Sequence, residues 1–175
     1  KEYRDCTWND SLGKVFPFPG PVQWHPDAWV GDHGAHFIEA VSSGEKPQFT
    51  WISFSGPHYP FDAPQEYYGR VNQDGLPSCR RREGELEDAA RIHHDSYFGG
   101  GHIDGCGTAP GHACRNYTED YWKRLQISYY ANIALIDDEV GKILEAVKKR
   151  YGENALVIFT ADHGEMLGNH GVWGK

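Results

Sequence analysis

The last sixteen residues of the chain hold the side chains best suited to binding and proton transfer. Asp162 and His163 are adjacent, and together they offer a hard carboxylate oxygen and an imidazole nitrogen to one divalent cation. Lys175 adds a positive charge, and His170 adds an imidazole, the side chain that most readily exchanges a proton near neutral pH. This composition predicts a site that binds a cation and an anion.

A further candidate lies in the segment Gly56-Pro-His58-Tyr-Pro-Phe61, where two prolines stiffen the backbone and project His58. An Asp-His-Gly triplet or a single histidine in a turn is common in proteins without a site there. The interpretation therefore depends on the elements that place the two loops.

Two apolar segments precede these loops. Residues 49–54 are rich in aromatic and β-branched side chains, and residues 155–160 form a continuous apolar run, so both are predicted to be buried strands. Ligand sites in open α/β sheets gather beyond the carboxyl ends of the strands. The order strand, helix, strand therefore predicts an α/β fold with both loops at one edge of a parallel sheet.

A long amphipathic helix is predicted from about Thr118 to a stop at Gly152. We expect two i,i+4 ion pairs on its solvent face, Asp138 with Lys142 and Glu145 with Lys149. The expected apolar face consists of Tyr130, Ile133, Ile136, Val140, Ile143, Leu144 and Val147.

The remaining segments give weaker signals. Residues 32–41 have helical spacing and are followed by Ser42, Ser43 and Gly44, so one short helix is expected there. Four prolines within residues 1–30 predict an ordered loop. Residues 76–115 show no period of 2 or 3.6 and are interpreted as an inserted surface loop.

Composition limits the function classes. The chain is 39% hydrophobic with 24 aromatic residues, as expected of a folded domain, and its net charge of −8 argues against nucleic-acid binding. No apolar run is long enough to span a membrane. The four cysteines are too few and too unevenly spaced to define a disulfide framework, and the compartment stays open between periplasmic, secreted and cytoplasmic.

The motifs resemble those of the sulfatases, within the alkaline-phosphatase-like superfamily. The segments that carry the resemblance are 51–64, 129–141 and 159–175. The resemblance implies an alkaline-phosphatase-like α/β sandwich with a mostly parallel central sheet flanked by helices. On this interpretation residues 1–175 form part of one such domain, with 76–115 inserted.

The resemblance also implies roles for the candidate residues. Asp162 and His163 would bind the cation, Lys175 would contact the anionic oxygens of a small sulfate ester, and His58 would contact the sulfate. Either His58 or His170 suits protonation of the departing alkoxide, and the residues do not choose between them. Calcium is the expected cation, while the imidazole ligand leaves room for manganese or zinc.

The nucleophile motif of the family, Cys or Ser followed by x-Pro-x-Arg, has no match in this sequence. A formylglycine nucleophile is therefore expected outside this segment, and the segment alone is expected to be inactive. Two other functions stay open, a phosphonate monoester or phosphodiester hydrolase of the same superfamily and a truncated domain without catalysis. The oligomeric state cannot be derived. The zinc-type side chains of His102, Cys106, His112 and Cys114 match no closed tetrahedral pattern.

Overall fold

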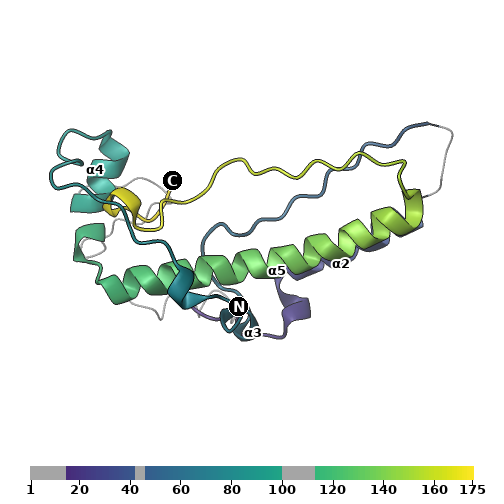
Figure 1. The fold of residues 1–175 in the computed structure, drawn as a ribbon, viewed down its shortest axis with the longest axis horizontal. Helices are drawn as coiled ribbons and strands as arrows, with labels where there is room; N and C mark the ends of the chain where they lie inside the picture. The colour runs from purple at the N-terminus through teal and green to yellow at the C-terminus, as the bar shows by residue number, and fades with distance from the viewer. Residues whose placement is uncertain (1–14, 42–45, 100–112) are drawn as a thin grey trace. The chain divides into compact units, whose positions relative to one another are not determined.

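The structure is a computed structural model that describes residues 15–41, 46–99 and 113–175 (Figure 1). The chain divides into two compact units, Lys1–Val71 with Ser128–Phe159 (unit 1) and Asn72–Ile127 with Thr160–Lys175 (unit 2). The helices are η1 (Val22–Trp24), α2 (Pro26–Ala40), α3 (Gln65–Tyr68), η2 (Gln73–Gly75), α4 (Arg91–Phe98), η3 (Cys114–Asn116), α5 (Glu119–Tyr151) and η4 (Asn169–Gly171).

Helix α2 begins earlier than the sequence predicts. Pro26 occupies its first turn, where a missing N–H is harmless, and the His25 ring accepts a hydrogen bond from the N–H of Asp27 at 3.2 Å. The loop predicted for residues 1–30 is therefore wrong from Pro26 onward. A proline breaks a helix in its interior but favours helix formation at the first helical position, which Pro26 occupies. The expected stop at residues 42–44 lies outside the described residues.

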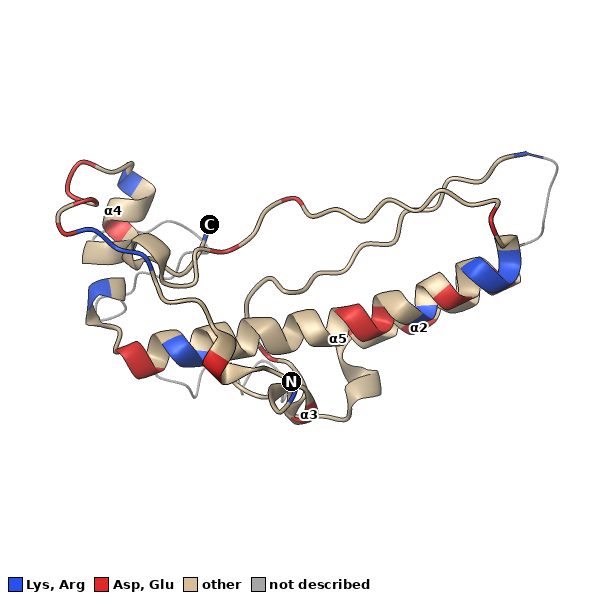
Figure 2. Cartoon of the chain, in the orientation of Figure 1, with Lys and Arg blue, Asp and Glu red and all other residues tan. Residues whose placement is uncertain are grey.

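Helix α5 matches its prediction closely. It spans Glu119–Tyr151, and Gly152 follows with φ 56° and donates its N–H to Lys148 O at 2.9 Å. Acidic residues occupy its first turn and basic residues its last, which complements the helix dipole (Figure 2).

The buried face of α5 differs from the predicted apolar face. Ile133 and Leu144, both predicted to be buried, are 38% and 43% exposed. The buried residues also include four polar ones, which a hydrophobic pattern cannot identify. The buried residues of α5 are Tyr121, Trp122, Leu125, Gln126, Ser128, Ala131, Asn132, Leu135, Ile136, Glu139 and Ala146.

The i,i+4 ion pairs predicted on α5 are also wrong. Lys142 Nζ lies 2.7 Å from Asp32 Oδ1 on α2 and 2.8 Å from the Glu139 carboxylate. Lys149 Nζ reaches Glu39 on α2 at 2.8 Å instead of Glu145. Helix α2 lies beside this part of α5, so the acidic residues of α2 form the ion pairs with these lysines.

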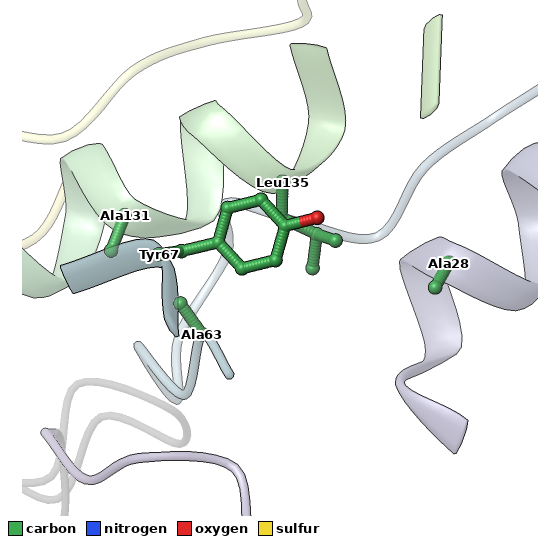
Figure 3. Packing of buried hydrophobic residues seen from close by; sticks show 5 residues of the cluster. All are labelled: Ala28, Ala63, Tyr67, Ala131 and Leu135. Atoms are coloured by element: carbon green, nitrogen blue, oxygen red, sulfur yellow. The ribbon is translucent and has the colours of Figure 1, made fainter. Parts of the chain in front are cut away.

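Small residues form the centre of unit 1. Ala28 of α2, Ala63, Tyr67 of α3, and Ala131 and Leu135 of α5 make one buried cluster (Figure 3). Three alanines in this cluster allow the backbones to approach closely around the tyrosine ring.

The two predicted strands are not paired in this structure. Residues 49–54 and 155–160 form no strand, and Phe49, Trp51 and Ile158 are 86%, 73% and 77% exposed. Among the described residues, β-pairing is limited to isolated bridges from Val15 to Phe61 and from Phe18 to Pro64. A strand gains burial and backbone hydrogen bonds from its neighbours, and neither segment is paired with another among the described residues. The predicted burial is not found, and the α/β class stays a prediction.

The segment predicted as an unstructured insertion contains regular structure. Helix α4 spans Arg91–Phe98 and ends at Gly99 with φ 80°. Leu86, Ser96 and Cys114 of the same segment are buried in unit 2. The polar sequence of α4 explains why periodicity does not reveal it. The described helices include none with the length and apolarity that crossing a membrane requires.

Candidate functional site

His58 lies in unit 1, in a loop whose backbone is fixed on both sides. The peptide bonds Gly56-Pro57 and Tyr59-Pro60 are cis, and the His58 N–H donates to Ser55 O at 3.3 Å. The ring stacks on Tyr59, and Nδ1 donates to Tyr59 O at 2.9 Å. In the neutral imidazole this leaves Nε2 as the nitrogen with the lone pair.

A buried carboxylate anchors this loop. Asp27 is 2% exposed, and its Oδ1 accepts hydrogen bonds from Ser55 N at 3.0 Å, Gly56 N at 3.1 Å and Ser55 Oγ at 3.3 Å. A Cβ at position 56 would lie 2.2 Å from Asp27 Oδ2, so only glycine fits there. The first turn of α2 thus sets the start of the His58 loop.

A polar cavity of about 150 Å³ adjoins His58 within unit 1. His25 forms part of its wall and is 3% exposed, with Nδ1 accepting from Asp27 N, so its proton lies on Nε2. Nε2 is 3.5 Å from the carboxylate of Asp62, which is also buried. The cavity therefore has both imidazole and carboxylate groups in its wall.

Three predicted residues of unit 2 lie together. His163 donates from Nδ1 to Gly164 O at 3.0 Å, and its Nε2 accepts from Lys175 Nζ at 2.8 Å. Asp162 Oδ2 lies 3.4 Å from the same Nε2. The His163 N–H donates to Asp162 Oδ1 at 2.9 Å and is the main cause of the lowered pKa of that carboxyl. The carboxylate is therefore ionised at neutral pH, as a cation ligand must be.

The segment between His163 and Lys175 folds back on itself. Leu167 N donates to Trp173 O at 3.0 Å, and Gly168, with φ 101°, donates to Val172 O at 2.9 Å. The buried Gln126 side chain of α5 donates to Leu167 O at 3.3 Å. These bonds return the chain so that the terminal Lys175 reaches His163.

The ring of the predicted residue His170 contacts a different segment of the same unit. Its Nδ1 lies 3.1 Å from Glu85 Oε2, and its backbone has φ 55°. Neither Glu85 nor Asp27 was identified from the sequence. The Pro26-Asp27 pair is a helix-start signal that could have revealed Asp27, whereas nothing in the pattern around Glu85 sets it apart.

The structure places the candidates in two different compact units. His58 belongs to unit 1, while Asp162, His163, His170 and Lys175 belong to unit 2. That His58 faces the same anion as Lys175 stays a prediction, as do the catalytic and metal-binding roles of all five residues.

The donor chemistry of Asp162 and His163 fits a divalent cation only in part. An ionised carboxylate and an imidazole nitrogen with a lone pair are suitable ligands. Lys175, however, donates to that same nitrogen. Within residues 15–41, 46–99 and 113–175 there is no group of three or more His, Cys, Asp or Glu side chains that could hold an ion. Further ligands would have to come from elsewhere. His102, Cys106 and His112, whose spacing with Cys114 matches no closed zinc pattern, lie outside the described residues.

Comparison with known proteins identifies related sequences. The chain matches the family described as Sulfatase over residues 7–175. It is 26% identical to iduronate 2-sulfatase of Mus musculus, over 86% of this chain and 27% of that protein. It is 29% identical to an arylsulfatase of Clostridium perfringens, over 86% of this chain and 29% of the relative.

A further relative has a broader description. The multifunctional alkaline phosphatase superfamily protein PehA of Trinickia caryophylli is 28% identical, over 74% of this chain and 26% of that protein. The chain thus spans less than a third of the length of these relatives.

Proposed function

This chain belongs to the sulfatase family, and from that premise we propose that the protein hydrolyses sulfate esters with Asp162, His163 and Lys175 in its active site. The observation that carries the proposal is the contact of Lys175 Nζ with His163 Nε2 at 2.8 Å, beside the ionised Asp162. This contact brings an ammonium group beside an imidazole and an ionised carboxylate, and the ammonium is suited to binding a small anion.

Each residue has a distinct task in the proposed reaction. A sulfate ester develops negative charge on its nonbridging oxygens and on the leaving oxygen as the S–O bond breaks. The ammonium of Lys175 binds the nonbridging oxygens, and His58 contacts the same sulfate. His170 or His58 gives a proton to the leaving oxygen. In both rings Nδ1 has a fixed acceptor, so Nε2 is the atom that transfers the proton.

We further propose that Asp162 and His163 hold a divalent cation, with calcium expected and manganese or zinc as alternatives. When bound, the cation supplies positive charge that stabilises the sulfate oxygens. Lys175 would compete with such a cation for His163 Nε2, and with Asp162 and His163 on the cation the lysine would be left to contact the anion. The nucleophile, proposed to be a formylglycine, lies outside this segment.

A phosphonate monoester or phosphodiester hydrolase is the second candidate function. The similarity to the PehA protein, which is named multifunctional within the alkaline phosphatase superfamily, favours it. Esters of phosphorus and sulfur present similar charged oxygens, so the residues of this chain serve either substrate.

The test compares two substrates with the full-length protein that contains this chain. A 4-nitrophenyl sulfate should be hydrolysed with a higher kcat/KM than bis(4-nitrophenyl) phosphate. Lys175→Ala should lower kcat/KM for the sulfate by about 10²–10³-fold, as loss of one transition-state contact does. Lys123→Ala, which removes an exposed lysine of α5, should leave the rate unchanged. A strong preference for the phosphate diester, or full activity of Lys175→Ala, would contradict the proposal.

A further inference from the structure

His170 adopts a backbone conformation that other residues of unit 2 must hold in place. Its φ of 55° lies in the left-handed region, which residues other than glycine rarely adopt. The N–H of His170 donates to Arg80 O at 2.7 Å, and Arg80 N donates in return to Asn169 Oδ1 at 3.0 Å. These two bonds tie His170 to the segment 80–85.

The same segment supplies a carboxylate to the His170 ring. Oε1 of Glu85 accepts from Arg82 N at 2.9 Å, and Oε2 lies 3.1 Å from His170 Nδ1. The side chain of Glu85 is 15% exposed, whereas that of His170 is 56% exposed. Each carboxylate oxygen therefore has its own donor, and the orientation of the carboxylate is fixed.

Electrostatics determine which nitrogen of the ring has the proton. The backbone N–H of Arg82, followed by His170, lowers the pKa of Glu85, so Glu85 is ionised at neutral pH and accepts hydrogen bonds only. Nδ1 must then be the donor. The positive charge of Arg82 also lowers the pKa of Glu85. Arg81 of the same segment donates from Nε to Gly168 O at 3.1 Å, which adds a second link between this segment and the chain before His170.

We propose that Glu85 is a positioning residue that fixes the tautomer of His170, so that Nε2 is the atom that exchanges protons with substrate. The inference rests on the proposed function. As the ester S–O bond breaks, sulfur bonds to the oxygen of the attacking hydroxyl, the proton of that hydroxyl passes to solvent water, and the leaving oxygen keeps the bonding pair. That oxygen takes the Nε2 proton, and the imidazolium becomes a neutral imidazole whose Nδ1–H remains on Glu85.

The experiment uses Glu85→Gln in the full-length protein. Glutamine keeps the size of the side chain but offers an N–H group, which permits the wrong tautomer. We expect kcat to fall about 10–100-fold, as is usual when a residue that orients a functional side chain is changed, with little change in KM. The loss should be large for alkyl sulfates, whose leaving group needs a proton, and small for 4-nitrophenyl sulfate.

Two comparisons separate this role from a structural one. Glu83→Gln changes an exposed carboxylate two residues away and should behave as wild type. Glu85→Asp, which restores a carboxylate, should recover part of the activity on alkyl sulfates. Equal loss on all substrates, or an effect on KM alone, would mean that Glu85 only supports the loop and would overturn the inference.

A measurement independent of turnover separates the inference from the proposed function. Nitrogen-15 NMR of the His170 ring should show a proton on Nδ1 of the neutral form in wild type and a mixture of tautomers in Glu85→Gln. Unchanged tautomers would refute the role of Glu85 even in an active sulfatase. If the tautomer shifts but the protein hydrolyses no sulfate ester, the proposed function is wrong and Glu85 still orients the ring. If His170→Ala retains full activity on alkyl sulfates, the catalytic use of His170 is refuted.

Discussion

Gly31→Ala tests how closely α2 and α5 approach in unit 1. A Cβ at position 31 would lie 2.2 Å from Glu139 Oε2 and 2.5 Å from Glu139 Cβ. The Cβ of Glu139 cannot move without its helix, so the two backbones must separate. Overpacking of this kind costs about 1–3 kcal/mol, and alanine returns about 1 kcal/mol of helix propensity. A contact this short belongs to the upper part of that range, about 2–3 kcal/mol, so we expect a net loss of about 1–2 kcal/mol.

The control is Gly141→Ala on α5, where a Cβ would have no heavy atom within 4 Å. The same substitution should stabilise the protein by up to about 1 kcal/mol there, because only the propensity term remains. Urea unfolding followed by circular dichroism gives both values. The two variants should shift the midpoint in opposite directions. A Gly31→Ala variant as stable as wild type would refute the close contact between the helices.

Two further predictions concern a buried charge and a strained glycine. Burial raises the pKa of Glu139 despite the nearby Lys142, so the folded state holds the Glu139 proton more tightly than the unfolded state. Ionisation of Glu139 therefore destabilises the protein as pH rises above 4.5. In Glu139→Gln, the urea midpoint should no longer fall with rising pH through this ionisation. A pH profile of the midpoint that is the same in the variant and in wild type would refute the buried charge. Gly168→Ala places a Cβ 2.4 Å from Cys79 Sγ at φ 101°. This substitution should lower the free energy of unfolding by about 2–3 kcal/mol. The expected sign is faster hydrogen exchange of the Leu167 amide, and an unchanged exchange rate would contradict the prediction.

Local signals in the sequence predicted the features that depend on nearby residues. The end of α5 follows from Gly152, whose positive φ the structure confirms. The family resemblance assigned His163 and Lys175 to one site, and a short return of the chain brings the two side chains into contact. Such features need no partner far along the sequence.

Features that depend on distant residues were missed or misassigned. His170 and Glu85 are 85 positions apart, and no pattern links them. Glu139 and Asn132 are polar, so a hydrophobic pattern assigns them to the surface, although neighbouring segments bury both. The ion pairs of Lys142 could not be predicted without knowing that α2 lies beside α5.

The unpaired segment after α5 has a practical consequence for handling the chain. Leu156, Val157, Ile158 and Phe159 are between 52% and 88% exposed and form an uncharged run with high β-propensity. An exposed run of this kind can pair as a β-strand with the same segment of another chain, which leads to aggregation. Expressed in isolation, the chain is expected to precipitate, and a charged residue in place of Ile158 should raise the concentration at which it stays in solution.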